Sequence, residues 1–351
     1  MDDITNVQRT NWKGSIPIML SLAPSSLSSP TMPSPVHRMI SRQTYLHMAL
    51  ESEVQRFHEY APMMINFQSM DQSSSTGDDE QALGVHSEDE KNGNGITKES
   101  DGDVDTKTGN FYPMCWFEDE DTGMPLRWHF FTGLLYDLFK LKKRSTISGD
   151  DSAGVGGSKS GSFLPWRIRV HYTSYPDSIL PLDDDTPQII FQHYLNSLKQ
   201  ALYIQHNSNR IVKNMTKQSH LQIWNGIKSS RFDLYREITV GLNGSGSSGD
   251  TITLENVPVR VLVDRRPAFA RPCKQYQEDD KTPVMIGDIL HQWLPDLFPN
   301  DIRNNDDNSD ISNCIWCIQG VQVPLKTPIS DLWKCLCHPD RFLYVIIVTN
   351  E

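Results

Sequence analysis

Hydrophobic and polar positions divide the chain into apolar blocks separated by polar stretches. Residues 68–110 are acidic and rich in Ser, Gly and Asn, with few large apolar side chains, so they cannot bury enough surface to offset the entropy lost on ordering. Residues 145–162 and 241–250 are rich in Gly and Ser, which is typical of flexible links. The folded blocks that this division predicts are 11–178, with disordered insertions at about 68–110 and 143–162, then 183–240 and 250–351.

The first block alternates between strand and helix patterns. Residues 166–172 alternate apolar side chains with Arg and His, as a strand with one buried face does. Strands are expected at residues 15–22, 43–49, 112–118, 125–128 and 166–172. Helices are expected at 50–60 and 133–140. The predicted order is therefore β-β-α-β-β-α-β.

The last block repeats this order, with local similarities between the two blocks. Pro125-Leu126-Arg127 precedes one predicted helix, and Pro324-Leu325-Lys326 precedes its counterpart. Strands are expected at 257–263, 273–277, 314–318, 321–323 and 342–348, and helices at 283–297 and 329–337. A mixed sheet with a helix packed on one face, in this order, is the ubiquitin-like arrangement. The fold class predicted is α+β, with two ubiquitin-like β-grasp domains flanking a helix-rich domain.

The middle block is predicted to be helical. Thr186-Pro187 is a favourable start, because Thr can cap a helix and Pro suits its first position. Phe191, Leu195, Leu198 and Leu202 then form one apolar stripe at helical spacing. A second helix is expected over residues 210–227.

Charge separates the middle block from the rest of the chain. The insertion at 68–110 has eleven carboxylates and three lysines, a net charge of −8 within a total of −11, whereas residues 186–232 contain no Asp or Glu and six cations. This basic stretch can be a solvated helix face, or a surface that meets an acidic partner or an anionic membrane. Under the second interpretation the binding residues are Arg210, Lys213 and Lys217.

No sequence motif indicates catalysis, a cofactor or a structural metal. Cys314 and Cys317 would lie on opposite faces of a strand, and Cys335 and Cys337 about 200° apart on a helix, so we expect free thiols instead of zinc ligands. Residues 154–160 faintly resemble a phosphate-binding loop, but Ser158 stands where the motif needs Gly. With no signal segment and no apolar run long enough to span a bilayer, we expect a cytoplasmic protein.

Lys199 lies about 80° around the predicted helix from Phe191, at the edge of the apolar stripe. Its stem would pack on apolar neighbours while its ammonium stays exposed. No carboxylate of residues 186–232 is available to pair with it. These properties suit an acceptor amine, and they also belong to any lysine at the border of a helix stripe.

Several segments resemble the autophagy-related protein 5 family, and together they cover most of the chain outside the insertions. The similar segments are Trp12-Lys13-Gly14-Ser15-Ile16-Pro17, Pro125-Leu126-Arg127-Trp128-His129, Gly133-Leu134-Leu135-Tyr136-Asp137-Leu138, residues 164–172, residues 220–226 and the final block. The resemblance implies two ubiquitin-like domains around a helical one. It also implies covalent attachment to the ubiquitin-like autophagy-related protein 12, for which the matching stretch 191–199 makes Lys199 the acceptor.

The same resemblance implies further partners and a location. The chain would bind the coiled-coil autophagy-related protein 16 and, through the conjugate, the conjugating-enzyme-like autophagy-related protein 3. The assembly would act like a ligase, promoting transfer of autophagy-related protein 8 to phosphatidylethanolamine on the preautophagosomal membrane, with no catalytic residue of its own and no nucleic-acid partner. Two alternatives remain: a ubiquitin-like adaptor or modifier outside autophagy, and a zinc-bearing ubiquitin ligase. A modifier needs a C-terminal Gly, whereas this sequence ends in Asn350-Glu351.

Overall fold

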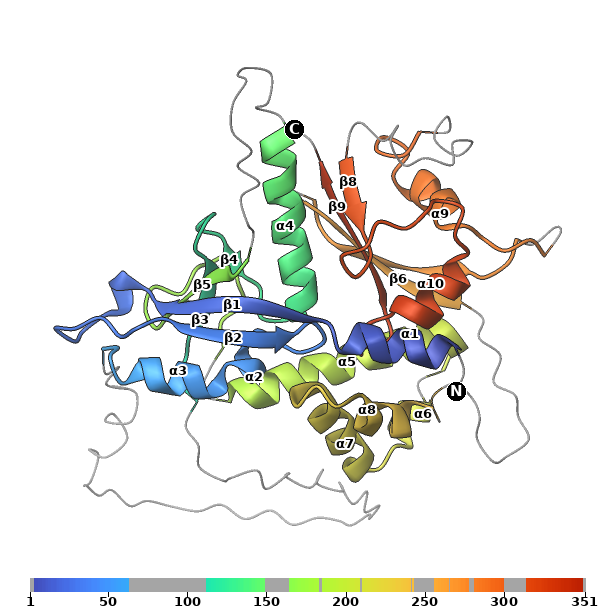
Figure 1. Ribbon diagram of the computed structural model, residues 1–351. Helices are drawn as coiled ribbons and strands as arrows, with labels where there is room; N and C mark the ends of the chain where they lie inside the picture. The colour runs from blue at the N-terminus through green and yellow to red at the C-terminus, as the bar shows by residue number, and fades with distance from the viewer. Residues whose placement is uncertain are drawn as a thin grey trace, which may run out of the picture. The chain divides into compact units, whose positions relative to one another are not determined.

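A computed structural model describes most of the predicted blocks (Figure 1). The residues described are 3–62, 112–148, 164–182, 185–208, 210–240, 242, 256–264, 266–277, 281–299 and 314–349. Residues 1–61 and 112–351 group into one compact unit, which carries all the elements discussed below. The acidic insertion at 68–110, the phosphate-loop-like stretch at 154–160 and nearly all of the predicted link at 241–250 lie outside the described residues.

The first sheet has five strands in the order β2-β1-β5-β3-β4. Its central pair, β1 and β5, is parallel, and its other neighbours are antiparallel. The strands are β1 (Ser15–Leu22), β2 (Val36–Ser41), β3 (Trp116–Asp119), β4 (Pro125–Leu126) and β5 (Trp166–His171). The helices of this block are α2 (Leu46–Ala49), α3 (Glu51–His58) and α4 (Thr132–Ser148), and Pro24–Ser26 forms a short 3-10 turn, η1. A parallel central pair made by the first and last strands is the predicted β-grasp topology.

The predicted second strand at 43–49 is wrong. The partner of β1 is β2, which pairs Ser15 with Ser41, while Leu46–Ala49 is helical. β2 lies at the edge of the sheet and leaves most of its side chains half-buried or exposed, so its apolar pattern is weak. Leu46 and Met48 are buried, and the apolar run that contains them has the composition of a strand although it is helical.

The predicted insertion at 143–162 also begins too early, because α4 continues to Ser148. No Gly or Pro interrupts the sequence between Leu141 and Ser148, so nothing local ends the helix there. Glycine first appears at Gly149, directly after the last helical residue. The predicted start of this insertion therefore lies several residues before the end of α4.

The second sheet has four described strands in the order β7-β6-β9-β8, again with a parallel central pair, β6 and β9. Its elements are β6 (Asn256–Val263), β7 (Phe269–Lys274), α9 (Ile286–Trp293), β8 (Cys314–Cys317), α10 (Ile329–Leu336) and β9 (Leu343–Thr349). β7 begins before the predicted 273–277 segment, and the predicted strand at 321–323 contributes only an isolated bridge between Ile318 and Val321.

Both faces of the second sheet are buried. Val345 and Ile347 of β9 belong to the core beneath α9 and α10, whereas Tyr344 and Ile346 belong to the core shared with the first block and the middle helices. Cys314 and Cys317 fall into these two different cores, so they lie on opposite faces of β8, as expected from their spacing. In Figure 1, α4 lies beside β9. One apolar core therefore contains residues of the first block, the middle block and the second sheet.

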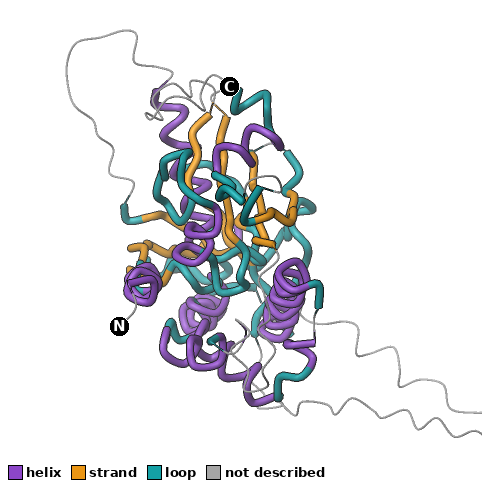
Figure 2. Tube along the Cα trace, turned by 90° about the vertical axis from the view of Figure 1, so that its right-hand side faces the viewer, coloured by secondary structure: helices purple, strands orange, loops and turns teal. Residues whose placement is uncertain are grey.

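The middle block contains α5 (Thr186–His206), α6 (Arg210–Lys213), α7 (Lys217–Lys228) and α8 (Phe232–Thr239). They lie below the strands in Figure 2. Leu195, Leu198 and Leu202 of the predicted stripe are buried. The single helix predicted at 210–227 is split, because the Thr216 hydroxyl caps α7 by accepting from the Ser219 amide (3.1 Å).

One glycine allows α7 and α8 to pack closely. A Cβ atom added at Gly226 would lie 2.9 Å from the Tyr235 amide nitrogen and 3.2 Å from the Arg231 carbonyl oxygen. The backbone of α8 occupies this space, so no side chain can be accommodated.

Helix α1 (Asp3–Trp12) was not predicted. It lies between the middle block and the second sheet's helices. The Gln8 side chain donates to the Lys334 carbonyl (2.7 Å), and Arg236 donates to the Thr5 hydroxyl (2.8 Å). Its last residue, Trp12, packs against Phe232 and Tyr235.

Candidate functional site: an acceptor lysine and a three-block pocket

Lys199 lies in the second half of α5, between the buried Leu198 and the exposed Gln200. Its side chain is half-buried. This burial agrees with a stem that packs along the edge of the helix, but the side chain is less exposed than expected. Tyr203, one turn further along the same face, is 55% exposed. Within the described residues Lys199 has no ion pair, so its ammonium is not fixed by a carboxylate.

The helix that carries Lys199 is held against the second sheet by buried polar contacts. The Ser197 hydroxyl donates to Asp340 Oδ2 (2.7 Å), and the Tyr344 hydroxyl donates to the same oxygen (2.6 Å). Arg260 donates to Tyr344 (2.9 Å) and to Gln200 (3.2 Å). Because Ser197 and Gln200 flank Lys199 on α5, their contacts fix the backbone from which the amine projects.

His220 of α7 lies close enough to Lys199 for their charges to interact. His220 is half-buried, and its pKa is lowered, chiefly by burial and also by the charge of Lys199. A neutral imidazole adds no positive charge beside the lysine. Helix α7 packs on α5 through Trp224, whose ring lies 5.2 Å from Phe191 and 5.8 Å from Tyr194.

The three basic residues proposed for surface binding lie close together along the chain and are exposed. Arg210 and Lys213 belong to α6, and Lys217 begins α7. Lys228, in the same basic stretch, instead pairs with Glu51 of the first block (2.8 Å). Counting charges along the sequence missed this pair, because the two residues are far apart in sequence.

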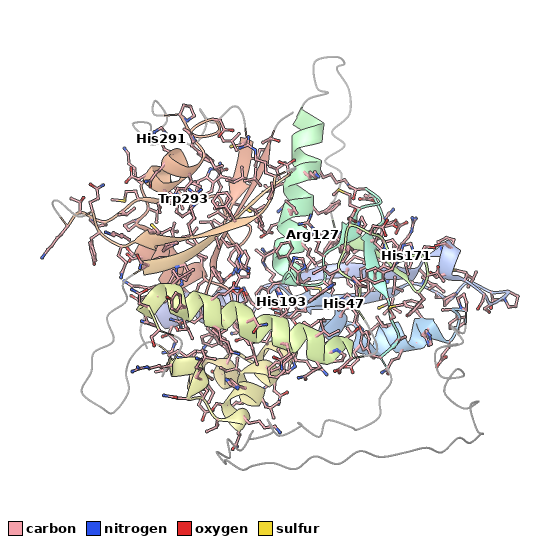
Figure 3. All side chains as sticks on the ribbon, turned by 180° about the vertical axis from the view of Figure 1, so that it is seen from behind. His47, Arg127, His171, His193, His291 and Trp293 are labelled. Atoms are coloured by element: carbon pink, nitrogen blue, oxygen red, sulfur yellow. The ribbon has the colours of Figure 1, made fainter. Side chains whose placement is uncertain are left out.

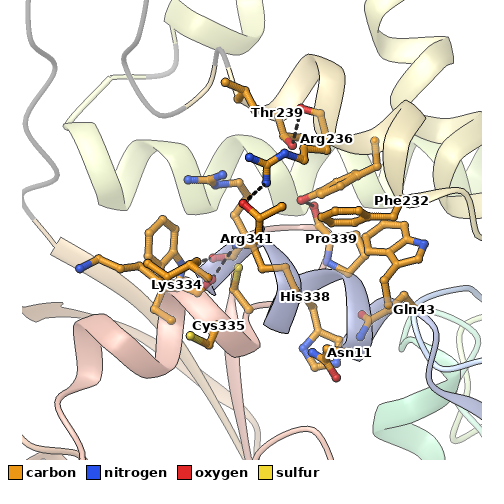
Figure 4. A pocket seen from close by; sticks show the side chains of 18 of the residues that line it. Asn11, Gln43, Phe232, Arg236, Thr239, Lys334, Cys335, His338, Pro339 and Arg341 are labelled. Atoms are coloured by element: carbon orange, nitrogen blue, oxygen red, sulfur yellow. Dashed lines mark hydrogen bonds between the residues drawn. The ribbon is translucent and has the colours of Figure 1, made fainter. Parts of the chain in front are cut away.

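A pocket of about 390 Å³ opens where all three blocks meet (Figure 4). Asn11 and Gln43 come from the first block, Phe232 and Arg236 from α8, and Lys334 from α10. Its lining mixes aromatic rings with polar groups, so it suits a partner side chain that is itself amphipathic. Sequence patterns did not reveal this pocket, because α1 forms one of its walls.

The pocket contains thiols but has no metal-binding geometry. Cys337 is half-buried, and the loss of solvation raises the pKa of its thiol to about 11. The part of the chain that the structure describes contains no cluster of three or more His, Cys, Asp or Glu side chains able to hold a metal ion. The described helices also include none with the length and apolar character needed to cross a membrane.

Comparison with known proteins identifies the blocks. Family models match in three places: "Autophagy protein ATG5, UblA domain" at residues 11–77 and 103–172, "alpha-helical bundle region" at 187–242 and "UblB domain" at 256–347. The chain is therefore a protein of two ubiquitin-like domains joined by a helical bundle. It belongs to the autophagy protein ATG5 family.

Individual relatives agree with this assignment. Autophagy protein 5 of Phaeosphaeria nodorum is 28% identical over 249 residues, covering 66% of this chain and 75% of that protein. Autophagy protein 5 of Aspergillus oryzae is 24% identical over 258 residues, covering 66% and 76%. The crystal structure of Kluyveromyces marxianus Atg5 superposes with a TM-score of 0.60 at 17% identity, covering 97% of this chain and 99% of that one, which supports the fold.

Proposed function

We propose that Lys199 accepts the C-terminal glycine of the ubiquitin-like autophagy-related protein 12. With the coiled-coil autophagy-related protein 16, the conjugate then works as a ligase-like scaffold. It recruits the conjugating-enzyme-like autophagy-related protein 3 and promotes transfer of autophagy-related protein 8 to phosphatidylethanolamine. The chain itself supplies no catalytic group, and the assembly works on the cytoplasmic side of the preautophagosomal membrane.

The observation that carries this proposal is the placement of Lys199. Its amine projects from a helix that Ser197 and Arg260 hold in place, it has no carboxylate partner among the described residues, and a half-buried neutral histidine lies nearby. In the reaction, the deprotonated amine attacks the carbonyl carbon of a thioester. The new N–C bond forms as the C–S bond breaks, the thiolate leaves with the donor enzyme, and the amine proton passes to solvent.

The three-block pocket is the site that we assign to the coiled-coil partner. A helix laid across α1, α8 and α10 could place an apolar side chain beside Phe232 and a polar one beside Arg236. Contact with all three blocks would also make binding depend on their relative arrangement. Family membership favours this scaffold over an adaptor outside autophagy or a zinc-bearing ligase.

Substitution of Lys199 tests the acceptor. Lys199→Arg keeps the charge and the stem but removes the nucleophile, because a guanidinium remains protonated. In a reconstituted reaction with autophagy-related protein 12 and its activating and conjugating enzymes, the variant should yield none of the heavier conjugate while its melting temperature is unchanged.

Two neighbouring lysines provide matched controls. Lys213→Arg and Lys217→Arg change exposed residues of the same basic stretch and should conjugate as the unmodified chain does. Full conjugation of the Lys199→Arg variant would show that another amine is the acceptor, even with the fold unchanged. Loss of conjugate in all three variants would point to a general effect on the helical block.

A further inference from the structure

A second cavity, of about 460 Å³, lies between the first block and the turn that joins β6 to β7. Its apolar lining includes Met124, Leu138 and Phe139 on one side and Pro267 and Ala268 on the other. Met124, Pro267 and Ala268 are exposed, so the cavity is an open groove with an apolar floor. None of its lining residues comes from α5 to α8, and it is therefore distinct from the surroundings of Lys199 and from the three-block pocket.

The acidic groups of this groove are already engaged within the chain. Asp119 accepts hydrogen bonds from the Thr122 amide (2.8 Å) and from the Trp166 indole (2.7 Å). Asp264 accepts from the Thr349 amide (2.9 Å). Both carboxylates are buried, so neither is free to pair with a ligand at the rim.

The basic groups at the rim of the groove are more exposed than these two carboxylates. Arg127 is exposed and lies near α4 (Figure 3), and Lys142 of α4 is half-buried with its Nζ 3.6 Å from the Met124 sulfur. Neither has an ion pair within the described residues. A third cation, Arg266, pairs with Asp296 (2.6 Å). The groove therefore has an apolar floor and a rim whose available charges are positive.

We propose that this groove docks a peptide segment of a partner protein in which large apolar side chains are flanked by Asp or Glu. The apolar side chains would cover Met124 and Leu138, and the carboxylates would meet Arg127 and Lys142. A second copy of this chain fits less well, because a symmetric contact would bring the two basic rims together. The proposed acceptor function neither requires nor excludes this groove.

Peptide selection tests the groove without assuming a partner. A displayed library of random peptides of about ten residues is selected on the full chain, and enriched peptides are synthesised with a fluorescent label. Enriched sequences should combine aromatic or aliphatic residues with Asp or Glu. Fluorescence anisotropy should show binding weakened by about tenfold or more in the Arg127→Glu/Lys142→Glu variant and in Met124→Glu.

The matched control reverses two exposed cations elsewhere. Arg210→Glu/Lys213→Glu makes the same charge change on α6 and should leave peptide affinity unchanged, with melting temperatures confirming that every variant folds. The proposal fails if no peptide is enriched, if the enriched peptides are basic, or if they bind the groove variants as tightly as the original chain. If the chain instead self-associates in sedimentation experiments, and Met124→Glu abolishes that self-association, the groove binds a second copy of the chain.

Discussion

His47 shows how one buried residue links stability to pH. It lies in α2 with its side chain 1% exposed, its Nε2 is 3.2 Å from the Cys115 carbonyl oxygen, and its ring packs against Phe117. Burial lowers its pKa to about 4. The folded protein therefore keeps this imidazole neutral at pH values where the unfolded chain would protonate it.

The sign of the pH dependence follows from that difference. As the pH falls from about 6.5 to about 4, the unfolded state takes up a proton at His47 that the folded state does not, so His47 lowers the free energy of unfolding by about 1.4 kcal/mol per pH unit. His47→Phe removes this contribution. Denaturant unfolding between pH 7 and 4.5 should show a shallower loss of stability for the variant, whatever its stability at pH 7.

A half-buried histidine, His129, provides the comparison. Burial also lowers the pKa of His129 to about 4. The His47→Phe variant should therefore retain part of the acid sensitivity. An identical pH slope in the variant and the unmodified chain would show that His47 is protonated in the folded state.

Lys199 illustrates which features of a single residue follow from sequence. Its position at the edge of an apolar stripe could be predicted, because side-chain direction on a helix depends on local spacing. The contacts that hold its helix could not, because Arg260 and Asp340 lie far along the chain. Its partial burial depends on the same tertiary packing.

At the scale of elements, α1 is stabilised by tertiary contacts and not by its own pattern. Its sequence has few apolar residues and no continuous stripe, which is why periodicity did not predict it. Trp12, 6% exposed, packs against Phe232 and Tyr235 with ring centroids 5.6 and 4.6 Å away. This aromatic cluster attaches α1 to α8.

Trp12→Ala should be strongly destabilising. Removing a buried aromatic side chain loses both its transfer free energy and its packing, and we expect a loss of about 3 to 5 kcal/mol in the free energy of unfolding. Equilibrium unfolding in denaturant measures it. A loss below about 1 kcal/mol would show that α1 contributes little to the fold.

Arg9→Ala is the matched control on the same helix. Arg9 forms an ion pair with Asp233 (2.9 Å), but the two side chains are 31% and 72% exposed. Such an exposed pair contributes at most about 1 kcal/mol. A similar loss in both variants would mean that the contacts of Arg9 hold α1 as strongly as the Trp12 ring does.

At the scale of the whole molecule, most of the order of elements can be predicted from the sequence, whereas their joint packing cannot. The apolar run at 342–348 indicates a strand buried on both faces. Which elements cover each face depends on contacts between blocks: α9 and α10 on one side, and the core shared with the first block on the other. The edge strand β2, mostly exposed, gave too little pattern to be found at all.

The exposed cations of the middle block lead to a prediction about membranes. Arg210, Lys213 and Lys217 are exposed, and each basic side chain near an anionic surface contributes about 1 kcal/mol. Reversing all three charges to Glu should weaken cosedimentation with vesicles containing phosphatidylserine by more than tenfold at low salt. The difference should shrink as salt rises, because screening weakens the attraction for both proteins.

A control variant separates local charge from net charge. Arg56, Lys140 and Lys281 are also exposed but lie on α3, on α4 and before α9, so their reversal makes the same change in net charge at scattered places. If the middle block forms the membrane-binding surface, this variant should bind vesicles much better than the Arg210, Lys213 and Lys217 variant. Equal weakening by both would mean that the overall field drives association. Unchanged binding at low salt after reversal of Arg210, Lys213 and Lys217 would instead mean that these residues form only a solvated helix face.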